Sequence, residues 1–206
     1  MFLLSIETTS RNVSVAAVEN TSILVECLWR SEDPGKEILA TIDFVLKKTC
    51  LPISCFERIV VSTGPGSWTG IRLGLGLALG LAKGDDKYIY GLSSLDGLIF
   101  RLGNFRSAGG AISGAGSNFH YIKYPDMQTL IQHPVPPLTG DRKKTQSFLG
   151  SCRIVACSKD TATLLKWQKK SPCVIGLDVS AGANALLARE RIILGVKPHN
   201  TPDYEK

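Results

Sequence analysis

Residues 2–29 read FLLSIETTSRNVSVAAVENTSILVECLW. Three apolar runs lie in this stretch, at residues 2–6, 13–18 and 22–29, and short polar segments separate them. Runs of this length, rich in Val, Ile and Leu and bounded by Ser, Thr and Asn, are typical of β-strands, and connections this short join antiparallel neighbours. The stretch therefore predicts a three-strand meander.

The residues that follow alternate between helical and strand patterns. Residues 36–48 have apolar side chains at the spacing of a helix with one apolar face, namely Ile38, Leu39, Ile42, Val45 and Leu46. Strands and helices are expected in alternation after it, at residues 58–62, 69–83, 88–91 and 95–102. Three antiparallel strands followed by helix-connected parallel strands form one ribonuclease H-like lobe of an actin-like fold.

The second half of the chain repeats this pattern less clearly. Residues 111–124 are expected to open a second sheet, residues 134–144 to form a loop, and the remaining elements to be strands at 154–158 and 173–178 and helices at 159–169 and 181–194. The predicted fold class is α/β, with two ribonuclease H-like lobes at residues 1–104 and 105–206, the second one shortened.

Residues 63–84, TGPGSWTGIRLGLGLALGLAKG, form a glycine-rich turn between a strand and a helix. Such turns bind phosphates in many folds, because backbone amides and a helix N-terminus meet the anion there. The phosphate-binding motif GxxxxGK[ST] is absent, since Ile71 and Arg72 follow Gly70, and the dinucleotide motif GxGxxG is replaced by GxGxxxG.

The helix expected over residues 69–83 has small residues on two sides. Gly70, Gly74, Ala78 and Ala82 form one stripe, and Gly76, Gly80 and Gly84 form another on the opposite side. A helix that is apolar all round is buried all round, yet the sheet of its own lobe covers one side only. The other side is therefore predicted to meet either a partner protein or the second lobe.

A partner surface is predicted on this side of the helix and on the adjoining helix. The helix contributes Arg72, Leu75, Gly76, Leu79 and Lys83, and Trp68 precedes it. The preceding helix adds Ala40 and Phe44, which lie away from its apolar face.

Composition sets further bounds. The chain has 206 residues and 24 Lys and Arg against 18 Asp and Glu, a net charge of +6, which permits contact with RNA or an acidic partner without requiring either. The opening residues lack the basic segment and cleavage pattern of a signal peptide, and no apolar run approaches the roughly 20 residues of a membrane span. We expect a cytoplasmic protein that has no contact with a membrane.

The cysteines do not predict a metal site. Two pairs, Cys50 with Cys55 and Cys152 with Cys157, have CxxxxC spacing. Residues 152–157 read as a strand, in which an odd spacing places Cys152 and Cys157 on opposite faces, and no His lies nearby. We therefore expect no bound metal, no other cofactor and reduced cysteines.

The quoted motifs resemble those of the TsaB (YeaZ) family. GPGSWTGIRLG, at residues 64–74, is similar to the family's GPGSFTGxRxG, and residues 3–20 are similar to its opening strand, turn and strand. The resemblance covers residues 1 to about 100 and becomes faint beyond 124. It implies an actin-like fold and a role in forming N6-threonylcarbamoyladenosine at adenosine 37 of tRNA.

The resemblance also implies a mode of action. Members of this family are not the transferase itself. They bind its catalytic paralogue, TsaD, through helices of the first lobe, have the ATPase TsaE as a further partner, and self-associate through the same surface. For this chain it implies a scaffold subunit without catalytic residues, which contacts tRNA indirectly. The paired-histidine metal motif of the catalytic paralogue is missing here, since His120, His133 and His199 are isolated.

A kinase or ATPase of the same fold is the alternative. It would use Glu7, Gly64, Gly66, Ser67 and Thr69 to hold a nucleotide. Two departures from the family pattern disfavour it. Glu7 stands where the pattern has Asp, and the charged residues that open the second lobe are replaced by Ser113, Ala115 and Asn118.

Direct tRNA binding is a third hypothesis. It predicts a basic stripe interleaved with aromatic side chains. The basic residues are instead dispersed, with Arg142, Lys143 and Lys144 in the predicted loop and Lys166, Lys169 and Lys170 on a predicted helix. The sequence therefore indicates at most a supporting contact with RNA.

Overall fold

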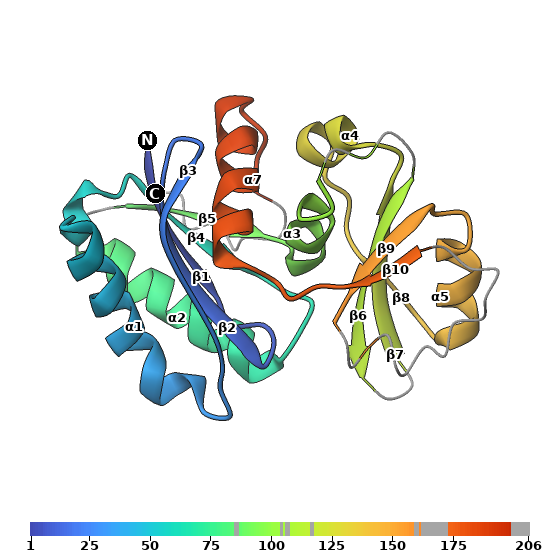
Figure 1. Cartoon of the computed structure of the whole chain (residues 1–206), viewed down its shortest axis with the longest axis horizontal. Helices are drawn as coiled ribbons and strands as arrows, with labels where there is room; N and C mark the ends of the chain where they lie inside the picture. The colour runs from blue at the N-terminus through green and yellow to red at the C-terminus, as the bar shows by residue number, and fades with distance from the viewer. Residues whose placement is uncertain are drawn as a thin grey trace. The chain divides into compact units, whose positions relative to one another are not determined.

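The computed structural model divides the chain into two compact units (Figure 1). The residues that it describes are 1–84, 87–103, 105, 108–115, 118–158, 161 and 173–198. Unit 1 contains Met1–Ser94 together with residues from Val179 onward, and unit 2 contains Leu95–Asp178.

Unit 1 is built on a five-stranded sheet of order β3-β2-β1-β4-β5. Its strands are β1 (Phe2–Glu7), β2 (Asn12–Glu19), β3 (Ser22–Arg30), β4 (Arg58–Ser62) and β5 (Tyr88–Leu92). The first three pair antiparallel, whereas β4 lies parallel to β1 and β5 parallel to β4. The predicted meander and the parallel addition that follows it are confirmed.

Helices cover both faces of this sheet (Figure 1). Its helical elements are α1 (Pro34–Thr49), the 3₁₀ turn η1 (Ile53–Cys55), α2 (Trp68–Lys83) and α7 (Ala181–Ile193). Alternate residues of β2 face opposite ways, so Val13 and Val15 join the core shared with α1 and α2, whereas Ser14 Oγ accepts a hydrogen bond of 2.8 Å from the Ala181 amide of α7.

Unit 2 has the same sheet topology. Its strand order is β10-β9-β6-β7-β8, with β6, β7 and β8 antiparallel and with β9 and β10 added in parallel. The strands are β6 (Gly109–Ala115), β7 (Asn118–Tyr124), β8 (Leu138–Gly140), β9 (Ile154–Cys157) and β10 (Cys173–Gly176). Two lobes with one topology confirm the predicted two-lobe α/β fold.

The described residues in or beside unit 2 include three short helices, namely α3 (Ser94–Phe100), α4 (Met127–Gln132) and α5 (Arg142–Leu149). The loop predicted at residues 134–144 is wrong in part, because β8 and the first turn of α5 lie within it. Asp141 caps α5 by accepting a hydrogen bond of 2.8 Å from the Lys144 amide. The helix predicted at 159–169 lies outside the described residues, apart from Thr161.

The division between the units differs from the one expected after residue 104. Residues 95–103 group with unit 2, and the C-terminal helix α7 groups with unit 1. The physical reason is that α7 packs on β1, β2 and β4. In addition, Ser180 Oγ, at the N-cap of α7, donates a hydrogen bond of 2.7 Å to Glu26 of β3.

Cys152 and Cys157 do not lie on opposite sides of a strand as expected. Strand β9 begins only at Ile154, and both thiols are buried in one core cluster with Phe119, Tyr121 and Leu149. No group of three or more His, Cys, Asp and Glu side chains in the described part of the chain is arranged to hold a metal ion. Among the described helices, none has the length and apolar character of a membrane span.

Candidate functional site

Helix α2 begins at a side-chain cap and buries its first small-residue stripe. Ser67 Oγ accepts a hydrogen bond of 3.2 Å from the Gly70 amide. Gly70, Gly74, Ala78 and Ala82 are buried, as a sheet-facing stripe requires. A Cβ atom at Gly70 would lie 1.9 Å from the Thr8 carbonyl oxygen, and one at Gly74 would lie 2.6 Å from Thr8 Oγ1. Thr8, directly after β1, therefore leaves no room for a side chain at either position, through its backbone at Gly70 and through its hydroxyl at Gly74.

The second stripe of α2 is open. A Cβ atom at Gly76, Gly80 or Gly84 would meet nothing within 4 Å. Arg72 and Lys83 on this side are exposed, whereas Leu75 and Leu79 are half-buried, and Leu75 packs against the core. Trp68, at the first turn, is 72% exposed. The described residues therefore leave this side of α2 free for a partner.

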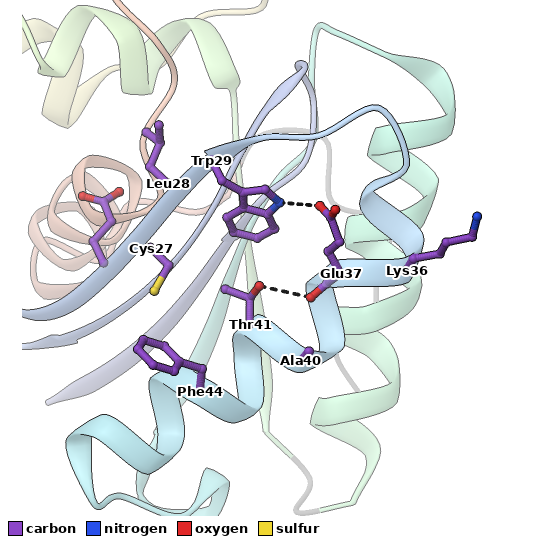
Figure 2. Close-up of a pocket in the computed structure, with 9 residues that line it drawn as sticks. Cys27, Leu28, Trp29, Lys36, Glu37, Ala40, Thr41 and Phe44 are labelled. Carbon is purple, nitrogen blue, oxygen red and sulfur yellow. Dashed lines mark hydrogen bonds between the residues drawn. The ribbon is translucent and has the colours of Figure 1, made fainter.

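The predicted residues of helix α1, Ala40 and Phe44, lie on its side toward β3 (Figure 2). Ala40 is exposed, and Phe44 is 47% exposed with Lys48 Nζ 5.5 Å from its ring centroid. Leu39 was expected on the apolar face that meets the core, but it is 58% exposed. The core-facing stripe consists of Ile38, Ile42 and Val45. Leu39 is thus an exposed apolar side chain that the sequence pattern assigned to the core.

A groove of about 700 Å³ lies between α1 and the edge strand β3 (Figure 2). Trp29, Thr41 and Phe44 point into the space between the strand and the helix, while Lys36 points away from it (Figure 2). Ala40 and Phe44 were predicted as partner residues, so the groove adjoins that part of the partner surface. We call it the α1–β3 groove.

Two hydrogen bonds shape this groove. Trp29 Nε1 donates to Glu37 Oε2 at 2.7 Å, and Thr41 Oγ1 donates to the Glu37 carbonyl oxygen at 3.0 Å. Hydrogen bonds from Ser31 and Trp29 lower the pKa of Glu37 below its ordinary value, because they stabilise the carboxylate. The sequence analysis did not identify Trp29 as a residue of the site. A Trp near the end of an expected strand, shortly before a helix, could have indicated it.

The glycine-rich loop packs against the turn that follows β1. The Ser67 amide donates to the Thr9 carbonyl at 2.7 Å, and a Cβ at Gly66 would lie 2.2 Å from that carbonyl oxygen. Gly64 has φ +96°, a conformation that favours glycine. Thr69 is exposed. The loop is thus packed onto the turn after β1, which disfavours its use as a phosphate cradle.

The carboxylate of Glu7 also makes its hydrogen bonds within unit 1. It is 0% exposed, and its carboxylate accepts hydrogen bonds from the Thr9 amide at 2.7 Å, from Asn184 Nδ2 at 3.0 Å and from the hydroxyls of Thr9 and Ser62. Burial raises the pKa of Glu7 above its ordinary value, and these hydrogen bonds oppose the shift. A buried carboxyl with four donors is not positioned to hold the magnesium ion of a nucleotide.

Comparison with known proteins gives the family. The family model described as TsaD, tRNA N6-adenosine threonylcarbamoyltransferase, matches residues 32–134, which are half of the chain. The tRNA threonylcarbamoyladenosine biosynthesis protein TsaB of Haemophilus influenzae is 36% identical over 96 residues, which are 45% of this chain and 39% of the relative. TsaB of Escherichia coli is 28% identical over 95 residues, covering 46% and 41%. The matched region thus spans about two fifths of these curated relatives.

Solved structures extend the similarity of fold to the whole chain. YeaZ from Pseudomonas aeruginosa superposes with a TM-score of 0.78 at 16% identity, covering 96% of this chain and 95% of that one. An activator of 2-hydroxyisocaproyl-CoA dehydratase from Clostridium difficile superposes with a TM-score of 0.59 at 12% identity, covering 95% and 96%. Because its family model matches half of the chain, the chain belongs to the family described as TsaD, tRNA N6-adenosine threonylcarbamoyltransferase.

Proposed function

We propose that the chain is a non-catalytic subunit in the synthesis of N6-threonylcarbamoyladenosine in tRNA. In this role it binds a TsaD-like transferase and stabilises the competent conformation of that enzyme. The names of the TsaB relatives and the TsaD family model support the pathway. A subunit of this kind would act in the cytoplasm.

The observation that carries the proposal is the open glycine stripe of α2. Gly76 and Gly80 lie on a helix whose opposite stripe is fully buried, and no described atom would meet a Cβ at either position. Glycine in a helix interior costs about 1 kcal/mol of stability relative to alanine. Close approach of a partner helix offsets that cost, because two backbones pack nearer where no side chain separates them.

The partner surface that we propose combines both helices. It consists of Ala40, Phe44, Trp68, Arg72, Leu75, Gly76, Leu79 and Lys83. Leu75 and Leu79 are half-buried and contribute part of their side chains, while the exposed aromatic side chains of Trp68 and Phe44 are the expected anchors. The α1–β3 groove beside Phe44 provides a recess for a side chain of the partner.

We propose no catalytic role because the residues that a kinase or ATPase would use make hydrogen bonds within unit 1 instead. Glu7 binds Thr9, Ser62 and Asn184 within unit 1, and the loop amide of Ser67 binds Thr9. A kinase or ATPase needs carboxylates and amides aimed at phosphate groups. We therefore propose that catalysis belongs to the transferase.

Further partners follow from the same role. A TsaE-like ATPase would bind the assembled pair, and tRNA would be held mainly by the transferase. Two copies of the chain would use the same helices to form a homodimer. Because the same surface would bind a second copy of the chain and the transferase, homodimer and heterodimer are mutually exclusive. Added transferase should therefore dissociate the homodimer.

Co-purification with the TsaD-like transferase of the same organism tests this proposal. The wild-type chain should elute with the transferase as one complex in size-exclusion chromatography with light scattering. Gly76→Trp should abolish the complex while the chain stays folded, since an indole at this position has open space in the free chain. Thr21→Trp, in the exposed turn between β2 and β3, is the matched control and should bind normally. A complex that survives Gly76→Trp would overturn the proposed surface.

A further inference from the structure

The net charge of the chain belongs entirely to unit 2. Residues 95–178 contain 11 Lys and Arg against 5 Asp and Glu, a net charge of +6. The rest of the chain contains 13 of each kind and is neutral. An asymmetry of this kind between two parts of one chain indicates a polyanionic partner for the charged part.

Four of the six described cations of unit 2 lie on α5 and on the residues that lead from it to β9. Residues 142–158 contain Arg142, Lys143, Lys144 and Arg153 and no Asp or Glu. All four cationic side chains are exposed, and among the described residues none of them takes part in an ion pair. We call these four residues the α5 basic surface.

Three of the five acids in the sequence of unit 2 make hydrogen bonds inside the unit. Asp126 and Asp141 are the N-caps of α4 and α5, and they accept hydrogen bonds of 2.7 Å and 2.8 Å from the amides of Thr129 and Lys144. Asp96 is buried and accepts a hydrogen bond of 3.0 Å from the Tyr124 hydroxyl. Since these carboxylates hold local structure, they leave the α5 basic surface largely uncompensated.

Helix stability does not explain the position of these cations. Arg142, Lys143 and Lys144 are the first three residues of α5, where the positive end of the helix dipole disfavours a cation. Lys123 lies at the other end, where its Nζ contacts the Phe148 carbonyl at 3.4 Å and lies 4.3 Å from the Phe148 ring centroid. Folding therefore accounts for Lys123 but opposes the three cations at the N-terminus.

We infer that the α5 basic surface binds the phosphate backbone of RNA. Arginine and lysine neutralise phosphates, and the exposed hydroxyl of Ser147 on the same helix is a further donor to a phosphate oxygen. RNA is favoured over an acidic protein because the exposed residues from Arg142 to Arg153 include no large apolar side chain, which a protein interface needs at its centre. The identification of tRNA as the RNA rests on the proposed function.

Titration of the full chain with a fluorescent, unmodified tRNA transcript tests this inference. In R142Q/K143Q/K144Q the affinity should fall at least about tenfold near 0.1 M salt, and the slope of log K against log salt should become shallower by about 2 to 3, since each lost phosphate contact removes about 0.7 to 0.9. The charge-matched control R11Q/R30Q/K47Q removes three exposed cations from unit 1 and should change the affinity less than about twofold. Equal losses in both triple variants would overturn the inference.

Thermal unfolding separates binding from folding. The R142Q/K143Q/K144Q variant should melt at the wild-type temperature or above it, because it removes cations from the positive end of α5. If that variant does not fold, the single variant Arg153→Gln carries the test and should bind the transcript about threefold more weakly with an unchanged melting temperature. Wild-type affinity in Arg153→Gln would then overturn the inference.

Two further outcomes identify which claim fails. Polyglutamate serves as a model of an acidic protein. If it binds as tightly as the transcript and depends on the same three cations, the inference that the ligand is RNA would be overturned in favour of an acidic protein. The triple variant should still form the complex with the transferase. If the triple variant binds RNA like the wild type and the complex with the transferase forms, only this inference fails. If RNA binding depends on the three cations but the chain forms no complex with the transferase, only the proposed function fails.

Discussion

Asn184 of α7 donates a hydrogen bond of 3.0 Å to the carboxylate of Glu7 on β1, a residue 177 positions earlier in the chain. The same amide nitrogen lies 2.9 Å from Ser62 Oγ, so the contact joins three elements of unit 1. Asn184 Oδ1 is buried and has no partner among the described residues. This polar cluster fixes α7 on the sheet of unit 1.

Replacement of Glu7 by Gln should flatten the pH dependence of stability. The folded-state pKa of Glu7 is raised by burial, so this carboxyl favours the folded state fully below its ordinary value of 4.5, and the contribution is lost as pH rises through the folded-state pKa. In Glu7→Gln, Asn184 can turn its unpartnered oxygen toward the new amide. Urea unfolding from pH 5 to pH 9 should show the wild type losing stability relative to the variant. A wild type that gains relative stability with rising pH would contradict the assignment.

Alanine at two positions of α2 should have opposite effects. Gly70→Ala places a Cβ 1.9 Å from the Thr8 carbonyl oxygen and should destabilise the chain by about 2 to 4 kcal/mol. Gly76→Ala meets nothing within 4 Å and should stabilise it by up to about 1 kcal/mol, because alanine favours the helix. Thermal unfolding of both variants checks this. A destabilised Gly76→Ala would mean that the second stripe is covered in the free chain.

The cysteines should differ in reactivity. Burial raises the pKa of Cys157 to about 11, and that of Cys152 is raised for the same reason. At pH 8 the thiolate fraction of Cys157 is about 0.1%, whereas Cys50, Cys55 and Cys173 are exposed. Iodoacetamide treatment of the native chain followed by peptide mass spectrometry should find those three labelled and the two buried thiols unlabelled. Rapid labelling of Cys157 would contradict the packing of unit 2.

Removal of Phe44 should weaken the complex more than the fold. Phe44 is 47% exposed and its ring contacts Lys48 Nζ, so Phe44→Ser should lower the free energy of unfolding by no more than about 1 kcal/mol. As an aromatic anchor of the partner surface, it should cost about 2 kcal/mol of binding, or roughly 30-fold in Kd. Calorimetry with the transferase measures the change. Asp43→Ser on the same helix is the control, and an equal loss in both would contradict the role of Phe44.

The first lobe was predictable because its signals are local. Alternating apolar runs gave the meander, and the spacing of small residues gave the buried stripe of α2, Gly70 to Ala82. Leu39 was misassigned because a one-residue offset on a helix rotates a side chain by about 100°. The β8 strand and α5 were missed because they follow a Pro-rich segment and have few apolar side chains, although Asp141 is a usable capping signal.

The surroundings of Glu7 and the α1–β3 groove depend on contacts between residues that lie far apart in the sequence, which a local sequence pattern does not reveal. Whether Glu7 faces an open cleft or a closed cluster is decided by Asn184 and Ser62, which lie 177 and 55 positions away. The grouping of α7 with unit 1 depends on the same long-range contacts. The α1–β3 groove likewise needs the side chain of Trp29 on a strand and that of Glu37 on a helix to meet.

Hydrogen exchange with and without the transferase tests the central claim most directly. The claim is that the open sides of α1 and α2 bind the catalytic partner. Peptides covering Pro34–Thr49 and Trp68–Lys83 should exchange more slowly in the complex, while the peptide covering Arg142–Leu149 keeps its rate when tRNA is absent. Unchanged exchange in both helices, with protection confined to unit 2, would contradict the account.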